Sequence, residues 1–597
     1  MPAEPLNNRV DEELESESPR EFGPTELLVR RPIWADIMVL VSLGAIFYMI
    51  VQVGEEFTGP RVTTQIDLSP SALPKYMMFS VFRGFAAYAL SLIFTLVYGY
   101  VAARNRRAER VMVPLLDVLQ SVPVLTFMPG LMLAFSALFP RSNIGLELVS
   151  IILIFTGQVW NMTFSFYHSL QAIPRELYDA ARVYRFSWLR RFTRVELPFA
   201  ALPLAWNSMV GMAGGWFFLT ICESFRLGEM DFRLPGIGSY MTTAIGVRDF
   251  RAMTYGVLAM TLAIIVIDRL IWRPVLAWAQ KFKYEETAPE EPAGSLVLDL
   301  LRASRVNELA LRAAGGLERV GYAARRYTRT IEDDLAPRLR VAERIGFYLL
   351  KAVYLAAAAA AIVAVLWGAW LLLGLVAKVT LADWLLIGRG AGLSLLRVVA
   401  ALVLATAWTV PVGILIGTNP RLCARMQSVI QVVASFPAPM LYPLVLLGLQ
   451  WAGIALGVGS IFLLMLGTQW YILFNAIAGS MGIPEELREA SRIYKIRGRQ
   501  LWNRLYLPAV LTSLVTGWIA AAGGAWNATI VAEYVPLGDT IFATEGLGAI
   551  ISMATSQKQF HILAASAMTM ALLVVMINRF VWRRIFTFAV ERYSLSQ

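Results

Sequence analysis

Apolar stretches of about 20 residues recur along this chain, and no other feature constrains its fold as strongly. A helix of roughly 20 residues crosses about 30 Å of hydrocarbon, and 57% of the residues are hydrophobic against 16% that are charged. Because a bilayer offers the backbone no hydrogen bonds, such stretches cross it as helices. The sequence predicts twelve spans, near residues 33–53, 76–103, 111–138, 147–170, 198–222, 252–275, 347–377, 386–417, 426–449, 452–478, 508–532 and 560–585.

Basic residues between the spans predict their orientation. Arg30 and Arg31 precede the first span, and Arg-rich segments at 103–110 and 175–194 follow the second and the fourth. Because cationic loops collect in the cytoplasm, both termini are expected there. This bias also explains the net charge of +11 without a nucleic-acid partner.

The sequence offers little for metal, disulfide or nucleotide chemistry. Cys222 and Cys423 lie far apart without metal-type spacing, and the two histidines are also distant from each other. No metal site, disulfide or cofactor is therefore predicted. The sequence contains no GxxxxGK[ST] run, so no phosphate-binding P-loop is expected in it.

The chain contains one long internal repeat. Residues 173–198 match residues 483–508 without a gap at an offset of 310, with ten of 26 positions identical, where composition alone gives about two. The same offset carries Glu223 onto Glu533. Six spans per copy is an even number, so the copies are expected to be parallel, related by a pseudo-two-fold axis along the membrane normal.

The repeat divides the predicted all-α membrane protein into four parts. A polar, acidic tail without a secretory signal pattern precedes the first copy. A charged, helical connector joins the two copies, and a regulatory role for it is the alternative to a plain linker. The parts are the tail 1–32, the first six-span repeat 33–277, the cytoplasmic linker 278–345 and the second six-span repeat 346–597.

The matched loop of each copy is predicted to contain a short cytoplasmic helix. Pro174 and Pro484 suit a first helical position, and Glu176 and Glu486 suit a first turn. Small residues and then basic ones follow, and small residues let a partner protein approach closely, which indicates a docking element. The alternative is an ordinary cytoplasmic loop that only stabilises the membrane topology. The remaining residues of interest are Asp179, Ala180, Ala181, Arg182 and Arg185 in the first copy, and Glu489, Ala490, Ser491, Arg492 and Lys495 in the second.

These motifs resemble the permease subunits of binding-protein-dependent ABC importers. The runs DAAR at 179–182 and EASR at 489–492 are similar to the "EAA" loop of that family. The Pro-rich segments at 120–129 and 434–443 are similar to its third span, and 532–551 resembles its nitrate, sulfonate and taurine branch. The resemblance covers about 200 residues of each half.

The resemblance implies a function and a set of partners. The loops would be coupling helices that sit in clefts of two ATP-binding cassette subunits, while a solute-binding protein docks outside a bacterial inner membrane. The implied substrate is a small inorganic or organic anion, such as nitrate, bicarbonate, taurine or a sulfonate, moved by ATP-driven alternating access. Since ATP hydrolysis falls to a separate polypeptide, the chain is not expected to be an enzyme.

Three residues depart from the family pattern. Arg185 and Lys495 stand where that loop usually has a glycine, and Asp179 replaces a glutamate. Two permeases are also fused where the family more often uses separate chains. These departures leave open the detailed turn of each loop and whether the two ATPase contacts are equivalent.

Ionisable residues inside the spans are candidates for the translocation pathway, because charges are costly in lipid. Arg83 and, at an offset of 314, Arg397 have two interpretations. Either they attract an anion, or they pair with carboxylates such as Glu223 and Glu533 and hold helices together, as buried charges commonly do.

Other pathway candidates come from the proline-rich spans and the fifth and eleventh spans. The prolines are expected to bend the third and ninth spans and to free carbonyls beside a cavity or a packed neighbour. Ser121 and Ser435 either line that cavity or pack. Trp216 and Trp526 are interpreted first as packing residues and second as ligand-stacking ones, and Asn527 lies beside Trp526.

Two other functions remain open from the sequence. A secondary transporter driven by an ion gradient would move solute without ATPase partners. A membrane scaffold or sensor would move nothing. The importer interpretation alone predicts that changing Glu489 or deleting 173–198 abolishes ATP-coupled uptake.

Overall fold

The computed structural model of the protein describes residues 65–282 and 366–593, apart from 228–229 and 538–539, with three further helical residues between 356 and 363. The N-terminal tail, the first predicted span, most of the seventh span and nearly all of the linker lie outside the described residues. The described residues belong to one compact unit, and they are mainly helical with two short β-hairpins.

The first half of this unit consists of long apolar helices joined by short elements. Glycines and small residues along these helices let neighbouring backbones approach closely, as is usual in lipid. Its elements are η2 Pro70–Ala72, α3 Leu73–Arg104, α4 Arg106–Ser121, η3 Val124–Phe127, α5 Met128–Leu138, α6 Ile144–Gln171, α7 Arg175–Val183, α8 Trp188–Arg191, η4 Phe192–Glu196, α9 Leu197–Glu223, β1 Arg226–Leu227, β2 Met230–Asp231, α10 Ile237–Gly246, α11 Phe250–Ile267, η5 Asp268–Trp272 and α12 Arg273–Gln280.

The second half repeats this order of elements almost completely. The pairs α3 and α15, α6 and α18, α9 and α21, and α11 and α23 are the long helices of the two copies, and each hairpin follows the same helix. Its elements are α15 Leu381–Gly417, α16 Pro420–Ser435, α17 Ala438–Trp451, α18 Leu456–Met481, α19 Glu485–Ile493, α20 Arg499–Leu501, η6 Trp502–Tyr506, α21 Leu507–Ala532, β3 Tyr534–Leu537, β4 Thr540–Ala543, α22 Leu547–Ser556, α23 Phe560–Ile577, η7 Asn578–Trp582 and α24 Arg583–Tyr593.

Seven helices of the described residues are long and apolar enough to cross a membrane, or eight if one sharply bent pair counts as a single span. The predicted class, an all-helical multi-pass membrane protein, is therefore confirmed. The count of twelve spans stays a prediction, because two of them fall largely outside the described residues. The span predicted at 198–222 corresponds to α9, a 27-residue helix.

Prolines interrupt the third and ninth predicted spans, as the sequence predicts. In the first half α4 ends at Ser121, and the chain is extended at Val122 before a helix resumes after Pro123. In the second half α16 and α17 meet at 83° across Phe436 and Pro437. A proline lacks the N–H that would continue the helical ladder, so each span becomes two helices.

Short helical segments lead into the long helix that follows each matched loop. The long helices α9 and α21 begin at Leu197 and Leu507, where the sequence predicts the next span to open, and in the first copy α8 and η4 precede α9 without a break. η4 is a π-helical turn in which the Leu197 N–H bonds the Phe192 carbonyl, five residues back. This widened turn comes immediately before Pro198, which has no N–H to donate.

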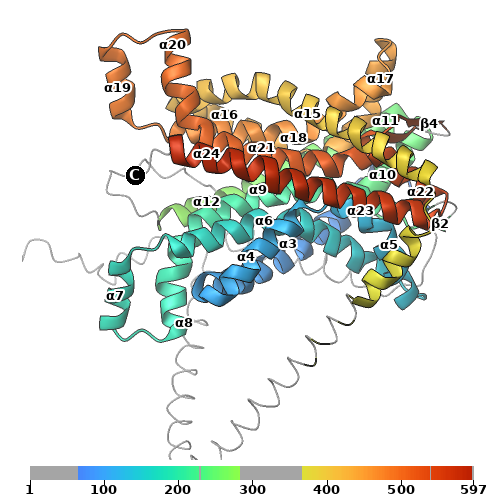
Figure 1. Ribbon diagram of the computed structural model, residues 1–597, viewed down its shortest axis with the longest axis horizontal. Coiled ribbons are helices and arrows are strands. Elements are labelled where there is room, and N and C mark those ends of the chain that lie inside the picture. The colour runs from blue at the N-terminus through green and yellow to red at the C-terminus, as the bar shows by residue number, and fades with distance from the viewer. Residues whose placement is uncertain are drawn as a thin grey trace, which may run out of the picture. The chain divides into compact units, whose positions relative to one another are not determined.

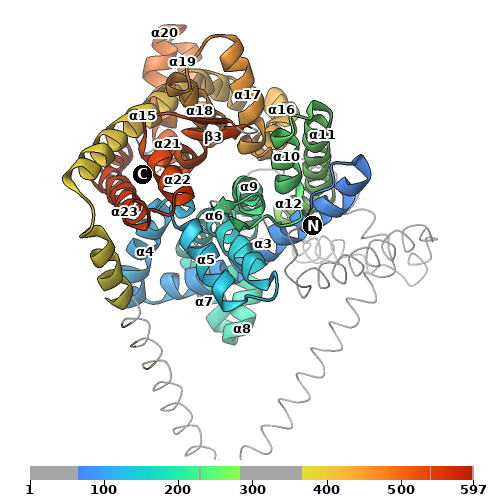
Figure 2. The same cartoon turned by 90° about the vertical axis from the view of Figure 1, so that its right-hand side faces the viewer.

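The two halves contact each other reciprocally. α4 of the first half packs against α23 of the second, and α16 of the second packs against α11 of the first. In the same way η3 contacts α21, and α17 contacts α9. Figure 2 shows α4 beside α23 and α16 beside α11. Each helix at the boundary therefore contacts, in the other half, the counterpart of the helix that its own counterpart contacts.

The helical hairpins α7–α8 and α19–α20 lie at the same end of the unit, and the β-hairpins lie at the opposite end (Figure 1). We call these the loop end and the hairpin end. Since both matched loops share one end, a single compartment can hold the partners of both.

Candidate coupling loops and translocation pathway

The matched loops fold as short helices in both halves, as predicted. α7 begins after Pro174 with Glu176 in its first turn, and α19 begins after Pro484 with Glu486 there. Carboxylates stabilise this position because the first N–H groups of a helix lack partners. The candidate coupling side chains that are exposed are Glu176, Asp179, Ala180, Arg182, Arg185, Glu486, Glu489, Arg492 and Lys495.

Two of the small residues in these helices face inward. Ala181 is 3% exposed, and its counterpart Ser491 is 9% exposed. We expected their size to permit a partner's approach, but at these two positions it serves packing inside the chain. Ala490 is half-buried. The exposed positions around them form the surface that a partner can reach.

Each loop turns on a residue with left-handed backbone. Arg185 has a φ of 48° and Lys495 a φ of 51°. In the first copy the Phe186 N–H bonds the Ala181 carbonyl and the Arg185 N–H bonds the Arg182 carbonyl, both at 2.9 Å, which is the Schellman cap of a helix C-terminus. The turn therefore keeps the backbone geometry that a glycine would adopt, although this costs a residue with a Cβ about 1–2 kcal/mol.

Replacing Arg185 or Lys495 with glycine is expected to stabilise its loop by up to about 1 kcal/mol, because the Cβ that opposes a positive φ is removed. Amide hydrogen exchange in α7 or α19 of the full chain measures this as slower exchange. Arg182→Gly is the matched control: it lies inside α7, where glycine is expected to cost about 1 kcal/mol. Faster amide hydrogen exchange in α7 of the Arg185→Gly variant would contradict the idea that the positive φ of Arg185 strains the loop.

The tip of each loop exposes two large apolar side chains. Val183 and Tyr184 are 79% and 74% exposed, and Ile493 and Tyr494 are 76% and 79% exposed. Exposed apolar groups at equal places in two copies indicate an interaction site. These residues are not among the predicted site residues. The sequence does contain a sign of them, since both copies keep a β-branched residue followed by a tyrosine within a basic loop.

The two loops are attached to the long helices by different contacts. In the first half Arg104, at the end of α3, donates to the Tyr178 hydroxyl of α7 and to the buried Glu196 carboxylate, the latter at 2.5 Å. In the second half Arg488 of α19 donates to the Ser480 carbonyl of α18 at 2.9 Å. α7 is thus tied to α3, and α19 to α18, so the two loops are not equivalent.

A buried ion-pair cluster holds the helices of the first half together. Arg83 of α3 donates through Nε and Nη2 to both oxygens of Glu147 of α6, at 2.6 Å each, and through Nη1 to Glu223 of α9 at 2.7 Å. The three side chains are at most 1% exposed. The pairing interpretation of Arg83 is confirmed. Glu147 was not predicted; its signal was a carboxylate at the start of an apolar stretch.

The second half contains a simpler version of this cluster. Arg397 donates to Glu533 at 3.0 Å and to the Glu545 carbonyl at 2.7 Å, so its pairing is also confirmed. The position of Glu147 is taken by Gly457, whose carbonyl accepts from Arg397 Nε at 3.0 Å. One arginine therefore faces two carboxylates in the first half and one in the second.

The carboxylate of each cluster also caps a short helix. Glu223 Oε2 accepts from the Gly238 N–H at 2.8 Å at the start of α10, and Glu533 Oε2 accepts from the Gly548 N–H at 2.9 Å at the start of α22. Ser80 bridges the first cap, donating to Glu223 Oε1 at 2.7 Å. The Glu and the Gly-x-Gly of the sequence motif therefore meet as a capped helix N-terminus.

Close packing explains the glycine before each short helix. A Cβ added at Gly236 would lie 2.3 Å from the Glu223 carboxyl carbon, and one at Gly546 would lie 2.2 Å from Glu533 Oε2. Both distances are far below van der Waals contact, and the carboxylates are held by several hydrogen bonds. Any larger residue must push the cap apart.

Gly236→Ala and Gly546→Ala are each expected to cost about 1–3 kcal/mol, the usual penalty for overpacking a buried site. Thermal unfolding of the purified chain in detergent measures the loss. Gly246→Ala in α10 is the matched control, because nothing lies within 4 Å of its added Cβ. Equal unfolding temperatures for Gly236→Ala and Gly246→Ala would show that the Glu223 carboxylate moves aside for the added methyl group without loss of stability.

The remaining predicted pathway residues fall into two environments. Trp216 is 2% exposed and packs beside Gly84 of α3. It also lines a small cavity with Ser435, whose hydroxyl donates to the Gln431 carbonyl at 2.8 Å. Ser121 is the last residue of α4. For these residues a place in the pathway stays a prediction.

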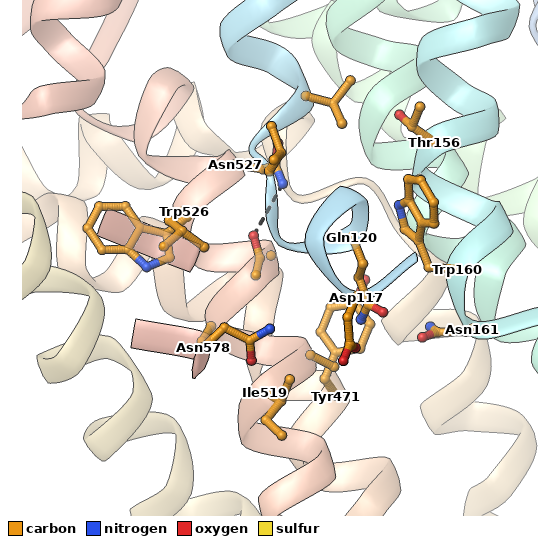
Figure 3. A pocket seen from close by; sticks show the side chains of 18 of the residues that line it. Asp117, Gln120, Thr156, Trp160, Asn161, Tyr471, Ile519, Trp526, Asn527 and Asn578 are labelled. Carbon is orange, nitrogen blue, oxygen red and sulfur yellow. Dashed lines mark hydrogen bonds between the residues drawn. The ribbon is translucent and has the colours of Figure 1, made fainter. Parts of the chain in front are cut away.

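A larger cavity lies between the two halves (Figure 3). Helices α4 and α6 of the first half and α18, α21 and α23 of the second contribute to its lining. Trp526 and Asn527 are on it, and Asn527 Oδ1 accepts from the Leu125 N–H across the boundary at 3.5 Å. Its polar lining residues include Asp117, Gln120, Thr156, Asn161, Tyr471, Asn527 and Asn578.

A repeated bundle of long apolar helices, with a helical hairpin in each copy, fits a fused transport permease. The chain belongs to the family described as binding-protein-dependent transport system inner membrane component, which matches residues 95–271 and again 409–592. The family thus occurs twice in tandem, in agreement with the internal repeat.

Relatives within this family are recognisable over parts of the chain. A putative ABC transporter permease protein of Methanocaldococcus jannaschii is 29% identical over 201 residues, which are 32% of this chain and 72% of that protein. The nitrate import permease protein NrtB of Synechocystis is 28% identical over 24% of this chain and 50% of its own length. The putative aliphatic sulfonates transport permease protein SsuC of Escherichia coli is 33% identical over 25% and 52%. The chain thus spans about half of the last two relatives.

Proposed function

We propose that this chain is the translocating subunit of an ATP-driven importer of a small solute that carries an oxyanion group. The carrying observation is the pair of helical hairpins at one end of the unit, each with an exposed apolar tip at Val183-Tyr184 or Ile493-Tyr494. Nitrate and aliphatic sulfonates, which name two of the relatives, support the oxyanion.

The proposed assembly has partners on both sides of the membrane. Two ATP-binding cassette subunits dock on α7–α8 and α19–α20 in the cytoplasm, where both termini also lie. A solute-binding protein docks on the hairpin end. The halves are parallel six-span repeats related by a pseudo-two-fold axis along the membrane normal, which the reciprocal contacts of α4 with α23 and α16 with α11 support.

Coupling in this assembly is mechanical. When the ATP-binding subunits close, they move the hairpins, and the motion reaches α3 through Arg104 and α18 through the Arg488 contact with Ser480. The Arg83 and Arg397 clusters hold the helices of each half as a rigid body. The two halves then rotate against each other, which opens the cavity between them to alternate sides.

Reconstitution in proteoliposomes tests this function. The full chain is combined with candidate ATP-binding subunits and a solute-binding protein, and uptake of labelled nitrate and alkanesulfonates is measured with ATP present or absent. We expect uptake of an oxyanion solute only with ATP and with both partners. Deleting 173–198 or replacing Glu489 is expected to abolish that uptake.

The same experiment separates the two other functions. A secondary transporter would take up solute from the chain alone under an ion gradient. A scaffold or sensor would show no uptake under any condition. Either result would overturn the importer, and uptake that follows ATP hydrolysis would exclude both.

A further inference from the structure

The helical hairpin α7–α8 and the end of α3 enclose a basic cavity at the loop end of the first half. The cavity has a volume of about 530 Å³, and its lining includes Arg104, Arg175, Arg182 and Arg191. Among the described residues of the lining, Asp179 is the one carboxylate. A volume of this size is usual for a small-ligand site. We call this cavity the arginine pocket.

Two arginines of the pocket are fixed in place by one buried carboxylate. Glu196 is fully buried, and its Oε1 accepts from Arg104 at 2.5 Å and from Arg191 at 3.0 Å. The other carboxylate, Asp179, pairs with Arg182 at 3.4 Å. Four guanidinium groups therefore face two carboxylates, which leaves a surplus of two positive charges at the pocket.

The second half places different residues at the equivalent positions. At the offset of 310, Arg175 and Arg191 correspond to Glu485 and Leu501. Glu485 pairs with Arg488 of the same helix at 3.6 Å, so its charge is balanced within α19. The surplus of positive charge is thus a property of the first loop and not of the repeated fold.

Side chains next to the pocket indicate that it lies at the level of lipid headgroups. Trp188 and Leu189 of α8 are 56% and 48% exposed. The Tyr100 hydroxyl of α3 accepts from Trp188 Nε1 at 2.5 Å and from Arg191 of the pocket at 3.5 Å. Arg104 ends α3, whose 32 residues extend about 48 Å, beyond the roughly 30 Å of hydrocarbon. Aromatic and basic residues at the end of an apolar helix are typical of the headgroup region.

We propose that the arginine pocket binds a phosphate group, supplied by the headgroup of an anionic phospholipid or by a soluble phosphate compound. Arginine suits phosphate because its planar group offers paired N–H donors. In its described contacts Arg104 donates from Nη2 alone, so its other N–H groups remain for a ligand. Basic pockets beside the cytoplasmic ends of membrane-crossing helices bind such headgroups, and the exposed Trp188 and Leu189 favour the lipid as the source.

A phosphate in this pocket connects three elements of the first half. Arg104 belongs to α3, Arg175 and Arg182 belong to α7, and Arg191 belongs to α8. One ligand therefore ties the helical hairpin to a long helix, and α7 is expected to open less often when the pocket is occupied. The further consequence, an ATPase contact adjusted by a ligand in one half only, rests on the proposed function; the binding itself does not.

Native mass spectrometry of the full chain in detergent tests the site without any ATPase partner. The chain is titrated with phosphatidylglycerol, with zwitterionic phosphatidylcholine for comparison, and separately with glycerol 3-phosphate as a soluble phosphate compound. We expect phosphatidylglycerol to bind at least about tenfold more tightly than phosphatidylcholine, because the choline brings a positive charge to a basic pocket. Amide hydrogen exchange is expected to slow in α7 on binding and to stay unchanged in α19.

Two charge reversals locate the site. Arg175→Glu gives the first loop the residue of the second, and Arg175 is exposed, so little packing is lost. Arg190→Glu is the matched control, since Arg190 is exposed on α8 outside the lining and the change in charge is the same. Arg175→Glu is expected to weaken phosphatidylglycerol binding by at least about tenfold, and Arg190→Glu by about twofold or less.

Each other outcome has a defined meaning. Glycerol 3-phosphate binding that is lost in Arg175→Glu, without a preference for phosphatidylglycerol, would keep the phosphate site and assign it a soluble ligand. Equal weakening in Arg175→Glu and Arg190→Glu would show a general attraction of charge and overturn the site. No binding of phosphatidylglycerol or glycerol 3-phosphate at millimolar concentration would also overturn it. Because ATP-driven uptake enters none of these measurements, failure of the site and failure of the proposed function are distinguishable.

Discussion

Arg83→Ala is expected to destabilise the folded protein by about 3–5 kcal/mol, the usual effect of removing one partner from a buried ion pair. The variant leaves Glu147 and Glu223 facing each other without a cation, and both are fully buried. A charge inside the membrane region finds no water to replace the lost partner. Thermal unfolding in detergent, together with the yield of monodisperse protein, measures the loss.

Two further variants test the cause of this effect. Arg397→Ala is expected to cost less, because only Glu533 is left and Arg397 is already 8% exposed. Adding Glu147→Gln to Arg83→Ala is expected to restore part of the stability, since one unpaired carboxylate is neutralised. Equal losses at Arg83 and Arg397, with no rescue by Glu147→Gln, would show that lost packing and not lost charge pairing is responsible.

The sequence predicted the features that depend on local pattern and on repetition. Apolar length predicted the long helices, the prolines predicted the broken spans at Pro123 and Pro437, and the Ile-Pro-x-Glu runs predicted α7 and α19. For Arg83 and Arg397 the cost of isolated charge in lipid left two interpretations, an anion contact or pairing with Glu223 and Glu533; the ion pairs are observed, and a place in the pathway stays a prediction. Each of these conclusions needs only a short segment or one strong energetic rule.

Features that depend on three-dimensional packing were missed. Glu147 could not be assigned to Arg83 because the repeat replaces it with Gly457, so comparing the copies hid it. The inward orientation of Ala181 depends on how α7 packs against the long helices. That packing cannot be read from the sequence of the loop alone. The meeting of Asp117 with Asn527 on one cavity joins elements 410 positions apart in the chain.

Tyr184→Ser combined with Tyr494→Ser is expected to abolish ATP-coupled uptake while leaving the fold intact. Both tyrosines are more than 70% exposed at the loop tips, so little packing within the chain is lost. A buried aromatic anchor at a protein interface typically contributes about 2 kcal/mol or more, which corresponds to roughly 30-fold in affinity at each site. Uptake into proteoliposomes and co-purification of the ATP-binding subunits measure the effect.

The single variants extend this test to the unequal attachment of the loops. Because α7 is tied to α3 through Arg104 and α19 to α18 through Arg488, Tyr184→Ser and Tyr494→Ser are expected to reduce uptake by different amounts, each by at least about tenfold. Tyr255→Ser is the control, since Tyr255 is an exposed tyrosine on α11, which lies away from the helical hairpins α7–α8 and α19–α20. Uptake that survives in the double variant, with the ATP-binding subunits still bound, would mean that force enters the chain elsewhere than at these tips.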